Sequence, residues 1–264
     1  MVYGAVVNTT IAHQPMLALS TSQIILLGTL ICAAALLYSS IGHGGGSGYI
    51  AAMALFGLAP EVMKPTALVL NILVASIGTV KFYRAGCFSW PLFWPFAIAS
   101  IPFAFLGGTL ALPVATYKIV VGLVLLFAAY RIFDYTRQAP TAADKPLVIP
   151  LAIFFGAGIG LLSGLTGVGG GIFLSPLLLL MGWANMRQTA GVSAPFILVN
   201  SIAGLLGHIS SVQMLPGALP VWAAAALIGA IIGTEFGSRR LNSLTLRRLL
   251  AAVLVIAGLK MIFV

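Results

Sequence analysis

The sequence is short of charged residues, and acids are the rarest of them. Of its 264 residues, 13 are Lys or Arg and only 4 are Asp or Glu, so 6% of the chain is charged while 61% is apolar. A soluble globular domain carries about 25% charged residues, which cover its water-facing surface. This chain has too few to build such a surface, and the sequence therefore predicts an integral membrane protein.

Other absences exclude whole classes of function. The 2 cysteines are too few for a disulfide framework or a tetrahedral zinc site. The 4 acids form no pair, and neither HExxH nor GxSxG with its partner residues is present. The sequence therefore predicts no catalytic residues, no metal site, no cofactor and no enzymatic activity. The net charge of +9 comes without a basic patch interleaved with aromatic residues, so no nucleic-acid partner is predicted either.

Long runs without charge predict helices that cross a lipid bilayer. Residues 85–117, 146–186 and 188–234 contain no Asp, Glu, Lys or Arg, and about 20 residues suffice to cross the ~30 Å hydrocarbon layer. Solid apolar runs such as 177–180 lack the alternation of a β-barrel strand, so the spans are expected to be helical. The first apolar stretch, 17–41, is too long for a signal peptide and is expected to remain as a helix.

A repeat divides the chain into two homologous halves. The motif GHGGG at 42–46 recurs as GVGGG at 167–171, a spacing of 125 residues, and other landmarks follow at the same spacing. The predicted halves are residues 1–137 and 147–264, and a polar linker, 138–146, joins them. Such duplication is common among membrane transporters.

Each half contains five apolar segments, of which the second is short. If all five cross the membrane, the halves are inverted relative to one another; if the short one only dips in and returns, four cross and the halves are parallel. The prediction is an all-α integral membrane protein with 8–10 transmembrane helices. The segments are approximately 17–41, 46–58, 64–83, 91–112 and 116–133, then 147–166, 171–184, 188–210, 217–237 and 245–264.

The distribution of Lys and Arg favours the inverted arrangement. Cytoplasmic loops carry an excess of these residues, and five crossings in each half place ten on one side and three, Lys64, Lys118 and Lys260, on the other. We therefore expect the linker 138–146 to be cytoplasmic and both termini to be periplasmic. The ten residues on the cytoplasmic side are Lys81, Arg84, Arg131, Arg137, Lys145, Arg187, Arg239, Arg240, Arg247 and Arg248.

The two glycine motifs are the strongest candidates for a ligand site. Each opens a short apolar segment, and glycines at the start of a helix leave backbone N–H groups unpaired at the positive end of the helix dipole, where anions bind. Paired short segments interrupted by glycine indicate a transport site near the membrane midplane. The alternative, that these glycines only allow close helix packing, is less favoured because the motif recurs. The candidates are Gly44, Gly45, Gly46, Gly169, Gly170 and Gly171.

Polar residues around the motifs provide further candidates. His43 is expected either to donate a hydrogen bond to an oxyanion or to take up a proton, because histidine titrates near pH 6.5; the alternative is a neutral histidine bonded to a carbonyl. Hydroxyl and amide groups are neutral donors, and their alternative role is hydrogen bonding between helices. The main candidates are Ser40, Asn71, Thr166 and Asn200, and further flanking residues of the same kind are Tyr38, Ser39, Ser76, Ser163 and Ser201.

Two charged residues fall within apolar segments. Lys81 lies three residues before Arg84 at a helix end, where it can extend to the membrane surface. Glu235 is expected to pair with Arg239, four residues later. No carboxylate is therefore predicted to couple transport to protons or sodium. Either His43 carries the coupling proton, or the anion gradient and the membrane potential drive transport.

The two glycine motifs within two sets of apolar helices resemble the sulfite exporter TauE/SafE family of membrane transporters, over nearly the whole chain. The resemblance implies a secondary transporter, working as an exporter, for small sulfur-containing anions such as sulfite or organosulfonates across a bacterial inner membrane. Gly48 and Ala51 stand where the second half has Phe173 and Pro176, so the two half-sites are chemically unequal. A transporter or channel for another small anion, and a non-catalytic membrane subunit, remain the alternatives.

Overall fold

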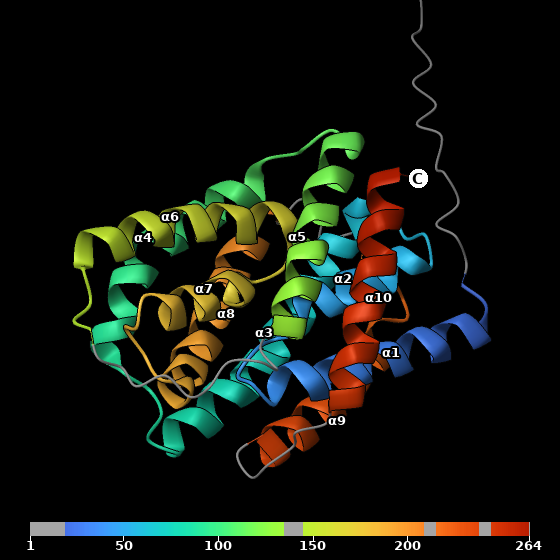
Figure 1. The fold of residues 1–264 in the computed structure, drawn as a ribbon. Coiled ribbons are helices and arrows are strands. Elements are labelled where there is room, and N and C mark those ends of the chain that lie inside the picture. Colours follow the sequence, from blue (N-terminus) through green and yellow to red (C-terminus); the bar gives the residue numbers. More distant parts are fainter. Residues whose placement is uncertain (1–18, 135–144, 209–214, 238–243, 264) are drawn as a thin grey trace, which may run out of the picture.

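The computed structural model describes residues 19–134, 145–208, 215–237 and 244–263, and these residues form ten helices and no strand (Figure 1). The prediction of an all-α protein is confirmed. The helices are α1 (Thr21–Ser39), α2 (Gly46–Leu55), α3 (Pro60–Arg84), α4 (Trp90–Thr109), α5 (Val114–Asp134), α6 (Ile149–Thr166), α7 (Gly171–Leu180), α8 (Met186–Gly207), α9 (Leu219–Gly237) and α10 (Leu244–Phe263).

The outer surface of the helices is apolar, as a lipid environment requires. Among the described helices, α1, α3, α4, α6 and α8 are long and apolar enough to cross a membrane. Large apolar side chains point outward from them; Phe154 on α6 is 72% exposed and Ile98 on α4 is 60% exposed. An extensive apolar exterior marks a surface that contacts something other than water. The predicted membrane protein is thus confirmed, while the total of 8–10 crossings stays a prediction.

Small residues bring the long helices into backbone contact. Gly156, Gly160 and Gly164 lie one turn apart on α6 and face α4; a Cβ added at Gly160 would overlap the backbone carbonyl of Ser100. Gly229 and Gly233 on α9 face α1 in the same way. Small residues at such spacings are the usual means by which membrane helices approach closely. For these glycines, close packing is a sufficient explanation.

The main helix pairs join the first five helices to the last five. The most extensive contacts are between α4 and α6, between α1 and α9, and between α5 and α10, and α3 lies against α8. In Figure 1 the green α5 and the red α10 run side by side, and α4 lies beside α6. The two sets of helices are therefore interlocked rather than placed next to each other.

Contacts at the helix termini define two ends of the bundle. At one, which we name the Lys64 end, the ammonium of Lys64 near the start of α3 meets the end of α4, and His208 after α8 binds the same end of α4. At the other, the Lys81 end, Lys81 late in α3 binds Glu235 late in α9, and Gly191 early in α8 packs against Cys87. Helices α3 and α8, which would correspond in the two predicted halves, thus run in opposite directions.

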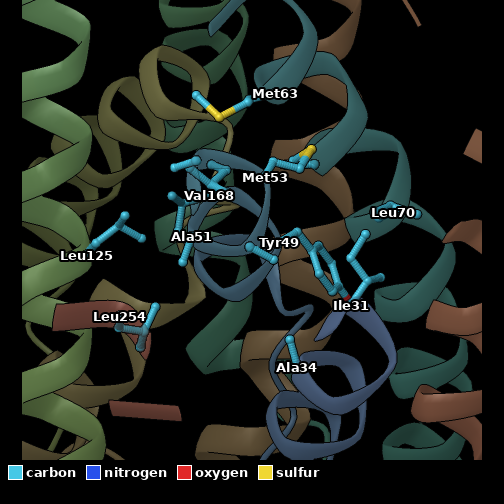
Figure 2. Close-up of a cluster of buried hydrophobic side chains, with 14 of the residues drawn as sticks. Ile31, Ala34, Tyr49, Ala51, Met53, Met63, Leu70, Leu125, Val168 and Leu254 are labelled. Carbon is cyan, nitrogen blue, oxygen red and sulfur yellow. The ribbon is translucent and has the colours of Figure 1, made fainter. Parts of the chain in front are cut away.

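The short helices α2 and α7 lie inside the bundle. Nine of the ten residues of α2 are buried, and Figure 2 shows its side chains Tyr49, Ala51 and Met53 among residues of α1, α3, α5 and α10. Each helix is about 15 Å long at 1.5 Å per residue, about half of the hydrocarbon layer. They end at Leu55 and Leu180, a few residues before the predicted ends.

Some predictions concern residues outside the described part of the chain. Residues 138–144 of the linker, Arg239, Arg240 and both chain termini belong to this group. The division into halves at the linker stays a prediction.

Candidate functional site

Two glycine-rich loops precede the short helices: the first glycine loop, residues 42–46, and the second glycine loop, residues 167–171. Gly45 and Gly170 are the N-cap residues of α2 and α7, both have positive φ (+101° and +81°), and neither helix has a side-chain cap. Only glycine adopts such angles without strain. The first amides of both helices therefore lack the side-chain acceptor that usually caps a helix.

The two loops meet at Asn71 of α3, which is fully buried. Its Nδ2 donates to the carbonyl oxygens of Val168, at 3.1 Å, and Gly167, at 3.4 Å. On the first loop, a Cβ added at Gly44 would lie 2.6 Å from Asn71 Oδ1, and one added at Gly46 would lie 2.5 Å from the carbonyl oxygen of Val168. The structure thus brings Asn71 and the predicted glycines of both loops together.

Buried polar atoms without a partner surround the second glycine loop. In the described part of the chain, three buried atoms near this loop have no hydrogen-bond partner: Asn71 Oδ1, Ser163 Oγ and Ser201 Oγ. Ser201 Oγ is 3.1 Å from the position of a Cβ on Gly169, and Ser163 Cβ is 3.4 Å from that of a Cβ on Gly170. Buried polar groups in native structures are nearly always paired, and the hydroxyls of Ser163 and Ser201 have hydrogens to donate beside the second glycine loop. Both serines are among the polar residues that the sequence predicts to flank the motifs.

His43 in the first glycine loop links the two halves. Its Nδ1 lies 3.1 Å from the carbonyl oxygen of Ile41, and its Nε2 lies 3.0 Å from the hydroxyl of Ser175 on α7. Ser175 in turn lies 2.9 Å from the hydroxyl of Ser193 on α8. Since a carbonyl only accepts, Nδ1 carries the proton and Nε2 accepts from Ser175 when the ring is neutral. Both ring nitrogens are engaged within the protein.

The hydroxyl and amide groups of the remaining predicted residues donate to the preceding helical turn, and Thr166 Oγ1 also accepts from the amide of Val168 at 3.4 Å. Ser40 Oγ donates to Leu37 O at 2.7 Å, and Thr166 Oγ1 donates to Leu162 O at 2.7 Å. Asn200 is fully buried and its Nδ2 donates to Phe196 O at 2.8 Å, but its Oδ1 has no partner among the described residues. Ser40 and Thr166 therefore flank the loops without a free donor, because each hydroxyl hydrogen is held by the preceding turn of the helix.

The two charged residues within the apolar segments form an ion pair with each other. The ammonium of Lys81 lies 3.3 Å from Glu235 Oε2, and both side chains are partly exposed. The predicted partner of Glu235, Arg239, lies outside the described residues. This ion pair joins α3 to α9 at the Lys81 end. Among the described residues, no carboxylate lies at the centre of the bundle.

Lys64 is a buried cation that sequence reasoning placed at the membrane surface. Its side chain is 4% exposed, and its Nζ donates to the carbonyl oxygens of Gly107, at 3.4 Å, and Gly108, at 3.3 Å. Its position seven residues before Asn71 could have indicated this role in the sequence, because that spacing puts both residues on one face of a helix. That face lies against the second glycine loop, since Gly167 packs on the stem of Lys64 and Asn71 binds its carbonyl.

His208 completes the polar groups of the Lys64 end. Its Nδ1 lies 3.2 Å from the carbonyl oxygen of Gly108, which Lys64 also binds. Burial and, to a smaller degree, the charge of Lys64 lower the pKa of His208, which follows the membrane-spanning part of α8. Among the described residues, no three His, Cys, Asp or Glu side chains are placed to share a metal ion.

Comparison with known proteins gives a consistent set of matches. The family model described as "Sulfite exporter TauE/SafE" matches residues 26–261. The probable membrane transporter protein y4hK of Sinorhizobium fredii (strain NBRC 101917 / NGR234) is 43% identical over 232 residues, 87% of this chain and 94% of that protein. The probable membrane transporter protein YjnA of Bacillus subtilis (strain 168) is 27% identical over 263 residues, 91% and 99% of the two chains. No solved structure matches the chain.

Proposed function

Because the chain belongs to the sulfite exporter TauE/SafE family of membrane transporters, we propose that it is a secondary transporter that exports small sulfur-containing anions, such as sulfite or organosulfonates, across a bacterial inner membrane. We propose transport without a catalysed reaction. The substrate class follows from the name of the family, and the site must therefore account for binding of an oxyanion.

One observation carries this proposal: two uncapped helix N-termini meet inside the bundle beside buried, unpartnered serine hydroxyls. Amides at a helix N-terminus bind anions, because the N–H groups converge and the helix dipole is positive there. A sulfite or sulfonate group has three oxygens, which accept several such bonds together with the hydroxyls of Ser163 and Ser201. Neutral donors hold the anion without the strong attraction of a full charge, which favours its release.

We further propose that the two halves are inverted repeats, with the Lys81 end cytoplasmic and the Lys64 end periplasmic. The opposite directions of α3 and α8 support the inversion. The ten Lys and Arg residues assigned to the cytoplasmic side support the orientation. The glycine loops then lie between the two surfaces, open to each in turn when one set of helices moves against the other.

The orientation makes a prediction about the chain termini. Reporter domains that are active only in the periplasm should be active when fused after Val264 and inactive when inserted in the linker 138–146. The opposite pattern would reverse the orientation. The same result at both positions, either activity at both or at neither, would place the linker and the C-terminus on one side of the membrane. That outcome would contradict the inverted arrangement and favour the parallel one.

The transported anion can be identified in liposomes that contain the purified protein. We expect saturable efflux of sulfite and of methanesulfonate, well above that from protein-free liposomes, and weak efflux of acetate and phosphate. Saturable transport restricted to the anions without sulfur would contradict the proposed substrate class. Flux that does not saturate would identify a channel, and no flux of any of these anions would leave a non-catalytic membrane subunit as the function.

A further inference from the structure

The Lys64 end of the bundle contains a buried positive charge without a negative partner. Among the described residues, no carboxylate lies within ion-pair distance of the Lys64 ammonium. The ion pair between Lys81 and Glu235 lies at the opposite end of the bundle. Glu61, one turn before Lys64 on α3, is exposed. A charge buried in a membrane protein is costly, and such residues are usually retained for binding or transport.

The hydrogen bonds of Lys64 leave it capacity for a ligand. An ammonium has three donors, and Lys64 makes two bonds, at 3.3 and 3.4 Å, to Gly107 and Gly108. Both are longer than the 2.7–3.2 Å typical of N–H···O bonds. The acceptors are neutral carbonyl oxygens, and one of them is shared with His208. Lys64 is therefore held by weak contacts that an anion can replace or add to.

The position of Lys64 connects it to the proposed anion site. A Cβ added at Gly167 would lie 3.2 Å from Cγ of Lys64 and 3.1 Å from its carbonyl oxygen, so the lysine stem packs directly on the second glycine loop. Asn71, two turns further along α3, binds the same loop. One face of α3 thus leads from the Lys64 ammonium to the point where the two loops meet.

The second half has no charge at the matching place. The spacing of 125 residues that relates the two motifs makes Thr189 of α8 the counterpart of Lys64 of α3. Thr189 is also buried, at 4% exposed, and its hydroxyl has no partner among the described residues. Both of these positions are thus buried and polar, but of the two only Lys64 carries a charge.

We propose that Lys64 binds the transported anion directly, as a cationic position at the Lys64 end in series with the glycine loops, and that it makes the protein prefer a charged sulfonate over a neutral sulfone. This inference rests on the proposed function. It adds to the neutral donors of the loops one full charge, placed where the anion enters or leaves on one side of the membrane.

The test compares Lys64→Gln with Lys64→Arg in the full-length protein. Glutamine keeps an N–H donor for Gly107 and Gly108 but removes the charge, whereas arginine keeps both. Calorimetric titration with methanesulfonate should show affinity about 10- to 100-fold weaker for Lys64→Gln, as expected for loss of a charged hydrogen bond, and little change for Lys64→Arg. Dimethyl sulfone, a neutral analogue of similar shape, should bind wild type and Lys64→Gln equally weakly.

Lys260 provides a matched control at the same end. It donates to the carbonyl oxygen of Leu55 at the end of α2, at 2.9 Å, away from the second glycine loop. Lys260→Gln should bind methanesulfonate as wild type does.

Two results would overturn the inference: unchanged affinity in Lys64→Gln, or a Lys64→Gln protein that no longer folds. Either would mean that Lys64 only stabilises the packing at the end of α4. If Gly170→Ala binds normally, the loop site itself is wrong, which separates the failure of the proposed function from that of this inference.

Discussion

Asn71→Asp is expected to reduce transport of methanesulfonate by about 100-fold or more while leaving the protein folded. Aspartate has the shape of asparagine, so its side chain fits the space between the loops without overlap. It replaces the donor to Gly167 and Val168 with an acceptor and places a negative charge where the anion is proposed to bind. Two like charges about 4 Å apart repel by about 4 kcal/mol at an effective dielectric constant of about 20. Efflux from liposomes is the measurement.

Asn185→Asp is the control for this substitution. Asn185 is the N-cap of α8, and its Oδ1 accepts from the amide of Gln188 at 3.0 Å. Aspartate caps a helix as well as asparagine does, so the variant should fold and transport normally. Transport by Asn71→Asp at the rate of Asn185→Asp would remove Asn71 from the site.

Gly170→Ala is expected to reduce transport by about 10- to 100-fold. An L-residue at the φ of +81° costs about 1–2 kcal/mol, and the new Cβ would lie 3.0 Å from Ile159 and 3.1 Å from Phe196. Relief of these contacts shifts the first amides of α7, and each hydrogen bond that they lose to a charged group is worth about 1.5–3 kcal/mol. The rate of efflux and the thermal stability in detergent are measured together.

Gly182→Ala separates backbone strain from loss of the site. Gly182 follows the other end of α7, has a φ of +67°, and would place its Cβ in ordinary contact, 3.6 Å from Lys145. Both variants carry the strain of an L-residue at positive φ, and Gly170→Ala adds its two tight contacts. Only Gly170→Ala should lose transport. Equal effects on transport would mean that α7 must merely be intact, and that its N-terminus holds no anion.

The fold was predictable because composition and helix length depend on local sequence and on the bilayer. Scarce charge and long apolar runs predicted helices, and the recurring motif located the short ones, whose starts at Gly46 and Gly171 match the structure. Their ends were predicted too late, because the positive φ of Gly57 and Gly182 closes each helix before the apolar run ends.

The site was predictable only in part, because its contacts join residues far apart in the sequence. The glycines and Asn71 were found from the repeat and its surroundings. The bond between His43 and Ser175 joins α7 to a loop 132 positions away, and no local pattern indicates it. The sequence places Lys64 with the surface charges, since one cation at the start of an apolar segment resembles a membrane anchor. It is buried because the end of α4 and the second glycine loop pack against it.

The interlocked helix pairs also determine when this protein can complete its fold during synthesis. Helix α1 is made first among the described helices, but its main partner, α9, is made almost last. Helix α4 likewise lacks its main partner until α6 has been made. Until α9 has been made, the backbone of α1 that will receive Gly229 and Gly233 of α9 faces lipid. The nascent first half therefore stays open where α9 and α10 will pack, and the two glycine loops can meet at Asn71 only after the second loop has been made.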